Sequence, residues 1–403
     1  MSTPRARHIP QLLDTHAEDL AFLWAQRRMV LDSAEHTLRD FAHLTERIEA
    51  HVQGLLVAPT PALRQRLEVA LGGGERDDIF AAAIAVLRCE DAAAVRWVLA
   101  EFSRAAGPTL DGLRDAMGQA PAALVGEELR QALARAKPAT AAAAATALAN
   151  LRLLNPEAPG LARLLVEDEA AACALGWRAA TRADCLGAAP SAARPHREAL
   201  ARPEPAVRHA AWASAAWLGH APLWVQLRRS VAEGDAVATH WLCVLGAPED
   251  SKALGTAVMA LPEPDQRCAA LARFGHPAAL PTLVRWMEGE DAVTAHAAGL
   301  AFTRITGAEI QGERRTLPVP DDADEIDREM APLVWTPDIA KARRLLEEQG
   351  AQWSTATRWC AGRRMDMAFA ADDLAALDLQ ARWDVAARAA LAGRPVSAPP
   401  PIV

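Results

Sequence analysis

The sequence predicts an all-α protein in which helical hairpins stack on one another as a right-handed solenoid. Composition is the first reason: Ala is the commonest of the 403 residues, Tyr is absent and 51% of the chain is hydrophobic. Ala favours helices, whereas strands favour β-branched and aromatic residues. The second reason is a repeating pattern of apolar helical runs that end in Gly and are followed by Pro. A large β domain and global disorder are both excluded.

The repeats are clearest between residues 204 and 307. Gly219, Gly246 and Gly275 each end an apolar run, at spacings of 27 and 29 residues, with Pro two or three residues later. We expect each Gly to adopt the left-handed conformation after a helix and each Pro to start the next helix. The first helices of these units have corresponding positions at intervals of 30, 29 and 27 residues, namely Val207, Val237, Gln266 and Val293.

One of these helices opens with an acidic turn and a Val-Arg step, at Val207-Arg208, and a fainter upstream copy has the same step at Val95-Arg96. The units thereby resemble HEAT-like repeats. A helix pair of about 30 residues cannot bury its own apolar faces, so neighbouring pairs must stack. We predict a HEAT-like repeat array over residues 59–310, preceded by an N-terminal helical hairpin over 1–58. A C-terminal helical cap over 311–403 would end in an extended or disordered Pro-rich tail.

Local signals refine the elements in order. Asp32 and Ser33 are expected to cap a second helix whose apolar seam runs from Leu38 to Leu55. The run of Ala from 141 to 145 predicts a closely packed helix. After Gly307 we expect a loop and then an acidic helix start at residues 321–329. Two more helices should follow, from Asp338 to Gln349 and from Asp372 to Leu391.

The two ends of the chain carry a narrower resemblance. HAEDLAFLWAQR at 16–27, HLTERIEAHVQGL at 43–55 and LPVPDDADEI at 317–326 are similar to an uncharacterised bacterial family with central HEAT-like repeats. Its members are often encoded near type VI secretion genes, so the resemblance implies an accessory role. The family has no established catalytic residues to carry over. The family's aromatic and basic C-terminal pattern corresponds loosely to TRWCAGR at 357–363.

Catalytic and cofactor signatures are missing from the sequence. It contains no GxxxxGK[ST], HExxH, GxSxG or CxxC pattern. GGGE at 72–75 is interpreted as a turn between helices. His36, Asp40 and His43 share one helical stripe, but that stripe lies opposite the apolar seam and is therefore a solvated face. His240 and His296 recur within the repeats and are expected to be partly buried. We therefore predict no metal, no cofactor and no catalytic residue.

Charge and cysteine use bear on location and partners. The net charge is −8, and the Arg pairs are scattered among acidic residues, which disfavours nucleic acid as a partner. None of the six cysteines has zinc-like spacing, and the N-terminus lacks the apolar segment of a signal peptide. Gly219, His220 and Pro222 interrupt the longest uncharged stretch, so no membrane span is expected. A cytoplasmic location is predicted.

The candidate binding residues lie on the second helices of the repeats, which line the concave surface of HEAT-like solenoids. Those helices contain Trp and Arg, the residue types that dominate interface energetics, and the candidates are Trp224, Arg228, Arg229, Arg285 and Trp286. A Trp at helical spacing can equally belong to the core. We expect a non-catalytic protein-binding scaffold or adaptor. The alternative is a HEAT-like enzyme, similar to a DNA glycosylase or a chromophore lyase. Partner identity and oligomeric state stay open.

Overall fold

The computed structural model describes residues 9–187, 194–319, 324–331, 333–353, 355–394 and 399–402. The protein is mostly α, and its helices pack largely in sequence order. The chain divides into two compact units: Met1–Leu223 with Asp378–Val403, and Trp224–Leu377. Among the described residues, no helix combines the length and the apolar character needed to span a membrane.

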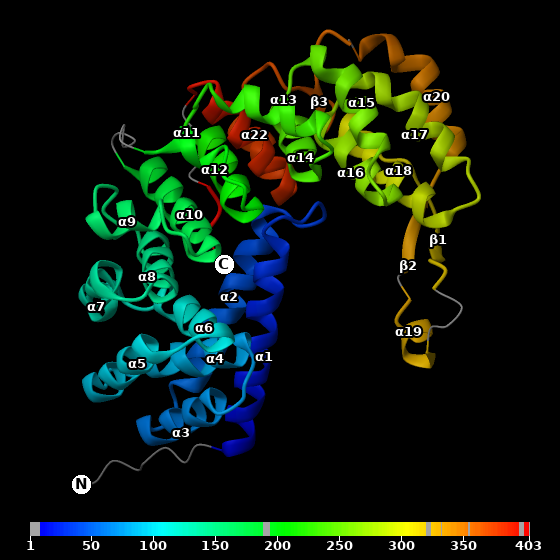
Figure 1. The fold of residues 1–403 in the computed structure, drawn as a ribbon. Helices are drawn as coiled ribbons and strands as arrows, with labels where there is room; N and C mark the ends of the chain where they lie inside the picture. Colours follow the sequence, from blue (N-terminus) through cyan, green and yellow to red (C-terminus); the bar gives the residue numbers. More distant parts are fainter. Residues whose placement is uncertain are drawn as a thin grey trace. The chain divides into compact units, whose positions relative to one another are not determined.

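The regular elements in the described part of the first unit are helices. These helices are α1 Pro10–Val30, α2 Leu38–Leu55, α3 Thr60–Leu71, α4 Arg76–Leu87, α5 Ala92–Arg104, α6 Gly107–Met117, α7 Ala122–Arg135, α8 Pro138–Asn150, α9 Pro159–Leu164, α10 Ala170–Leu186, α11 His196–Ala199, α12 Pro205–Trp217 and α22 Leu379–Leu391. Helices α4, α6, α8, α10, α12 and α22 pack in succession, with α3, α5, α7 and α9 beside them (Figure 1).

Small residues let the helices of this row approach one another closely. The predicted Ala helix is confirmed, because residues 140–149 of α8 are all buried. At Gly112 of α6, an added Cβ would lie 2.4 Å from the carbonyl oxygen of Arg76 on α4, so only glycine fits there. Large aromatic rings fill the remaining space: Trp24 of α1 stacks on Phe80 of α4 with ring centroids 3.8 Å apart. Such dense packing is where most of the stability of helices in proteins comes from.

The N-terminal hairpin forms as predicted, but its cap differs. The second helix, α2, begins after Thr37 instead of after Asp32 and Ser33. Thr37 Oγ1 accepts from the backbone N–H of Asp40 at 3.4 Å, and the Asp40 carboxylate accepts from the Thr37 N–H at 2.8 Å. This reciprocal capping box satisfies two amide groups at once, and Asp32–Ser33 lie too far from the helix start to do so.

A long-range pairing closes the first unit, and sequence analysis did not anticipate it. The backbone N–H of Leu379, at the start of α22, donates to the carbonyl oxygen of His36 at 2.7 Å. Trp383 Nε1 donates to the carbonyl oxygen of Leu31 at 2.9 Å. The α22 helix thus binds the turn between α1 and α2 as well as α12.

The second unit combines helices with two small antiparallel sheets of two strands each. Its elements are α13 Leu223–Ala232, α14 Ala236–Leu245, α15 Ser251–Met259, α16 Pro264–Phe274, α17 Leu280–Met287, α18 Ala292–Thr306, β1 Gln311–Thr316, α19 Glu325–Glu329, β2 Leu333–Pro337, α20 Ile339–Gln349, β3 Trp359–Cys360, β4 Arg363–Arg364 and α21 Ala371–Ala376. Leu223 itself belongs to the first unit. The core gathers around Leu283, Phe302, Ile305 and Trp353.

Two of the three repeat glycines adopt the predicted conformation. Gly219 and Gly275 have φ values of 67° and 65°, in the left-handed region. The prediction is wrong for Gly246, whose φ is −55°. Glycine is needed there for a different reason, since a Cβ would lie 2.5 Å from the carbonyl oxygen of Leu242. Pro248 and Pro277 start short 3₁₀ turns, Pro248–Asp250 and Pro277–Ala279, that lead into α15 and α17.

The C-terminal region is not all-helical, which corrects the prediction of a helical cap. The expected loop after Gly307 contains β1, which pairs with β2 in antiparallel register, Arg315 opposite Val334. The partner of each β1 residue is distant in the sequence, and QGERRT lacks the apolar alternation that signals a strand. The pair is held on the helices by β2, where Pro337 contacts Gly299 of α18.

The expected C-terminal helices form with one interruption. The first is α20, capped by Asp338. The second divides into α21 and α22, because Leu377 is extended and Asp378 caps α22 by accepting from the N–H of Ala381 at 2.7 Å. The acidic helix start becomes α19, while residues 321–323 lie outside the described chain. Of the Pro-rich tail, residues 399–402 are described, and Ile402 is buried.

Candidate functional site

Helix α13 presents three of the predicted binding residues to solvent at least in part. Leu227 and Val231 are buried at a spacing of four residues, which turns the opposite side of the helix outward. The Arg228 and Arg229 side chains are 58% and 72% exposed, whereas Trp224, three residues before Leu227, borders the buried face and is half-buried.

The two arginines of α13 have different partners. Arg228 lies over the ring of Trp224, 5.7 Å from its centroid, and its Nε donates to Asp250 at 3.2 Å. Arg229 forms an ion pair of 2.8 Å with Glu233, one turn along the helix. Val225 follows Trp224 in the sequence and is 72% exposed. The result is a surface, here called the α13 surface, composed of Trp224, Val225, Arg228 and Arg229.

The other predicted pair, on α17, is divided between solvent and core. Arg285 is exposed and has a long contact of 3.5 Å with the Thr282 hydroxyl. Trp286 is half-buried and packs against the hydrophobic core of the second unit. The structure therefore brings Trp224 and Arg228 together but does not place Arg285 and Trp286 on one face. A binding role for all five residues stays a prediction.

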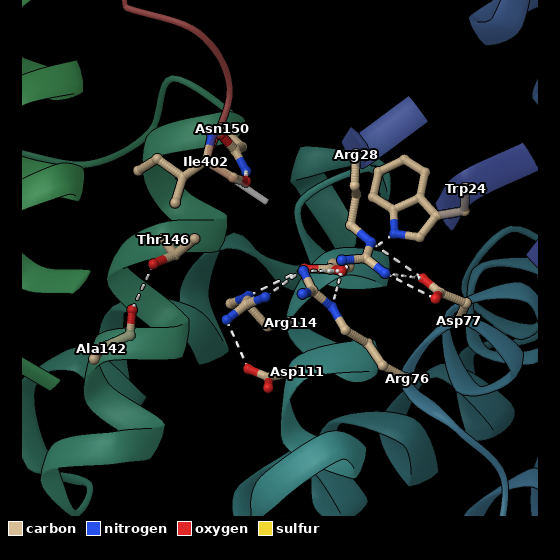
Figure 2. A network of polar contacts seen from close by, with 11 residues as sticks. Trp24, Arg28, Arg76, Asp77, Asp111, Arg114, Ala142, Thr146, Asn150 and Ile402 are labelled. Carbon is tan, nitrogen blue, oxygen red and sulfur yellow. Dashed lines mark hydrogen bonds and ion pairs between the residues drawn. The ribbon is translucent and has the colours of Figure 1, made fainter. Parts of the chain in front are cut away.

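A buried charge cluster joins α1, α4 and α6 in the first unit (Figure 2). At its centre is Asp115, whose side chain is 2% exposed. Its Oδ2 accepts from Trp24 Nε1 at 3.2 Å and from Arg76 Nε at 2.8 Å. Its Oδ1 accepts from Arg114 Nε and Nη2 at 3.0 and 2.9 Å. Four donors saturate this carboxylate, so it is a structural hub and is not free to act as a general base.

Arg27 lies beside this cluster and is only 7% exposed. Burial lowers the pKa of Arg27 to about 10, and the nearby charge of Asp115 opposes that shift. The guanidinium therefore stays protonated at neutral pH. It lies 4.4 Å from the ring centroid of Phe41, and its Nε donates to the Thr45 hydroxyl at 3.3 Å. These contacts fasten α1 to α2.

A Ser–His pair in the first unit is placed for packing, not for nucleophilic catalysis. His196 Nε2 lies 3.1 Å from Ser214 Oγ, and both residues are buried. Burial, with a smaller contribution from His220, lowers the pKa of His196 to about 4. A general base works best with a pKa near the working pH. This imidazole is therefore a weak base at pH 7, enclosed between Trp177 and His220.

The histidines considered as metal ligands are not gathered into a site. His36 precedes α2 and contacts the Ser33 hydroxyl at 2.8 Å, Asp40 caps the helix, and His43 is exposed. No group of three His, Cys, Asp or Glu residues suited to a metal ion occurs within the described ranges. His240 and His296 are half-buried, as predicted. Each of the six cysteines, all of which are described, is free of a disulfide.

The glycine-rich turn after α3 borders a cavity of about 720 Å³. Gly73 and Gly74 line it together with Asp14, Glu18 and Asp78. The Arg66 side chain also lines the cavity, but it is paired with Asp14. A wall with three carboxylates repels a phosphate group. The turn therefore offers no phosphate site.

Sequence reasoning missed a buried polar residue with many contacts in the second unit. Arg358 is 1% exposed and donates to several backbone carbonyl groups. Its Nη1 reaches the oxygens of Val244 and Gly246 at 3.0 and 2.5 Å. Further bonds go to carbonyls at residues 243, 273 and 274. These groups end α14 and α16, where helix carbonyls lack internal partners. TRWCAGR was the available signal, but nothing local to it indicates burial.

Two more residues that sequence reasoning missed are Asn150 and Arg182, whose side chains form hydrogen bonds with Ile402 and Pro399.

Comparison with known proteins identifies no family: the chain matches no protein-family model, no curated protein and no solved structure.

Proposed function

We propose that the chain is a non-catalytic protein-binding scaffold and that its helices form a right-handed solenoid of HEAT-like hairpins. The observation that carries the binding proposal is the α13 surface. It combines an exposed apolar side chain, Val225, with the guanidinium groups of Arg228 and Arg229 and the edge of Trp224. Arg and Trp supply large contact area and directional hydrogen bonds at protein interfaces.

The local contacts of the α13 surface suit an exchangeable interface. Trp224 and Asp250 hold Arg228 in one position, which lowers the entropy lost when a partner binds. Arg229 and Glu233 form an exposed ion pair, and such pairs contribute at most about 1 kcal/mol. A partner carboxylate can therefore replace Glu233 at small cost. Asp250, the partner of Arg228, is 11% exposed and also accepts from the N–H of Ala247, so it is held in place. The expected partner is a protein with an acidic rim around an apolar centre.

The solenoid proposal is supported by recurring helix starts. Acidic residues occupy the N-cap positions of α12, α14, α16 and α18 at intervals of 28 to 31 residues, namely Glu204, Asp235, Glu263 and Asp291. The side chains of Asp235 and Asp291 also accept from backbone N–H groups of the first turn. A helix start repeated at this spacing supports a stack of hairpins. From the resemblance of the two ends to a family encoded near type VI secretion genes, we also propose that the chain has an accessory role in such a system.

The test is affinity purification of the tagged chain from cells that normally produce it, followed by quantitative mass spectrometry. The Arg228→Glu/Arg229→Glu variant reverses the charge of the α13 surface. The matched control is Arg343→Glu/Arg344→Glu, an adjacent pair of exposed arginines on α20. We expect one protein to accompany the wild type and the control in near-stoichiometric amount and to fall at least tenfold with the α13 variant. Equal recovery with all three chains would remove the α13 surface from the interface.

A further inference from the structure

A side-chain clamp on α8 holds the backbone of a segment more than two hundred residues away. Asn150 Nδ2 donates to the carbonyl oxygen of Ile402 at 2.7 Å, and Asn150 Oδ1 accepts from the N–H of the same residue at 3.0 Å (Figure 2). One carboxamide thus satisfies both polar backbone groups of one residue, as a neighbouring strand would. These two hydrogen bonds contact the main chain of Ile402 and do not depend on its side chain.

A second contact extends the clamp along the peptide. Arg182 of α10 donates from Nη1 to the carbonyl oxygen of Pro399. The Arg182 residue is 8% exposed, and burial lowers the pKa of its guanidinium. Its Nε is buried and has no hydrogen-bond partner among the described residues. A buried donor without a partner is costly, so this arginine retains capacity for a further acceptor.

The bound segment has the chemistry of a peptide ligand. Residues 399–402 read Pro-Pro-Pro-Ile, and Ile402 is 9% exposed. Proline fixes φ and has no N–H, so a Pro run is already extended and leaves no donor to be desolvated. Specificity comes from the buried Ile402 side chain, and a cavity of about 200 Å³ lined by Ala149, Arg152 and Ala183 opens nearby.

We propose that the face of α8 and α10 around Asn150 and Arg182 is a binding site for an extended proline-rich peptide with a branched apolar residue, and that residues 399–402 occupy it in cis. The contact consists of three hydrogen bonds from the Asn150 and Arg182 side chains to the backbone of residues 399–402, together with the buried Ile402 side chain. The site is independent of the α13 surface, so either can fail without the other.

The test removes residues 394–403 from the chain and supplies them again as a separate peptide. A chain ending at Gly393 is titrated with a fluorescein-labelled peptide of residues 394–403, and fluorescence anisotropy is recorded. We expect saturable binding, and binding at least tenfold weaker to the full chain because its own segment competes. Asn150→Ala in the shortened chain should abolish binding. Asn155→Ala is the matched control, since Asn155 caps only the N–H of Glu157. A peptide with Asp in place of Ile402 should not bind.

The circular dichroism spectrum and thermal unfolding of the shortened chain establish that it is folded. If truncation prevents folding, the full chain with Ile402→Asp provides the same test, because a carboxylate cannot occupy the buried position. The absence of peptide binding to a folded, vacated chain would overturn the proposal. Equal binding by the Asn150→Ala and Asn155→Ala chains would overturn it as well.

Discussion

Arg358 Nη1 donates to the carbonyl oxygen of Val244 at 3.0 Å and thereby joins the segment after α20 to the end of α14. The neighbouring backbone continues this connection: the N–H of Trp359 donates to the oxygen of Gly275 at 2.7 Å, and the N–H of Ala361 to that of Arg304 at 2.6 Å. One segment therefore seals the C-terminal ends of α14, α16 and α18. Its role follows from the unpaired carbonyls that every helix leaves at that end.

Replacement of Arg358 by Ala should destabilise the second unit by about 3 to 5 kcal/mol, because it leaves buried carbonyl groups without donors. Arg358→Lys keeps the charge but not the planar fork and should recover only part of the loss. Urea denaturation measures both. Arg363→Ala is the control: that side chain is 56% exposed and paired with Asp373, so its loss should cost about 1 kcal/mol or less. Equal costs for Arg358→Ala and Arg363→Ala would contradict the sealing role.

Trp217→Ala should cost about 3 to 5 kcal/mol, because Trp217 is buried on α12 and its removal leaves a cavity. The same substitution at Trp335, which is 46% exposed on β2, should cost much less. Denaturant titration compares the two variants. A loss below about 1 kcal/mol at Trp217 would be incompatible with its placement in the core.

Asp115→Asn should destabilise the first unit by about 3 to 5 kcal/mol, because Arg76 and the buried guanidinium of Arg114 then lose the buried carboxylate that both contact. Asp111→Asn makes the same chemical change one turn away. Asp111 also pairs with Arg114, but its side chain is 44% exposed, so we expect a loss of about 1 kcal/mol or less. The urea midpoints of the two variants are compared. Equal losses for Asp115→Asn and Asp111→Asn would contradict the role of Asp115 as a buried hub.

His196 should make the stability of the first unit depend on pH. Its pKa falls from 6.5 to about 4 on folding, so the unfolded chain binds a proton between these values that the folded chain does not. Stability contributed by the neutral ring is present above pH 6.5 and decreases as the pH falls towards 4. His220 and Arg194 face the ring and oppose its protonation.

The measurement is the difference in urea midpoint between the wild type and His196→Gln from pH 7.5 to 4.5. Burial lowers the pKa of His240 as well, to about 3, but that group is common to both chains and cancels. We expect the wild type to lose more stability than the variant on acidification. Parallel profiles would show that His196 is not protected from protonation.

Much of the helical fold could be predicted from local sequence. The apolar seam predicted from Leu38 to Leu55 has the bounds of α2, and its members Ile48, Val52 and Leu55 are buried. The Ala run at 141–145 is buried as expected. Both signals lie within one element. The β1 strand could not be found in this way, because its pairing partner is β2 and its own residues do not alternate.

The contacts that organise each unit over long range left no local signal. Asn150 and Ile402 are 252 residues apart, and neither residue type is distinctive in its own stretch. Arg358 has the composition of a surface residue and becomes buried only because two helix ends meet around it. The predicted interface residues were chosen by residue type. The structure leaves Arg228 and Arg229 accessible but packs Trp286 on the core.

Photo-crosslinking at the α13 surface tests the central claim, a protein partner bound there, most directly. Benzoyl-phenylalanine is incorporated at Val225, which is 72% exposed, and in a control chain at Met259, which is 53% exposed on α15. Cells that normally produce the protein are irradiated and the adducts are sequenced. The account predicts one dominant protein adduct at position 225 and none at 259. Adducts that are absent at 225, or identical at both positions, would contradict it.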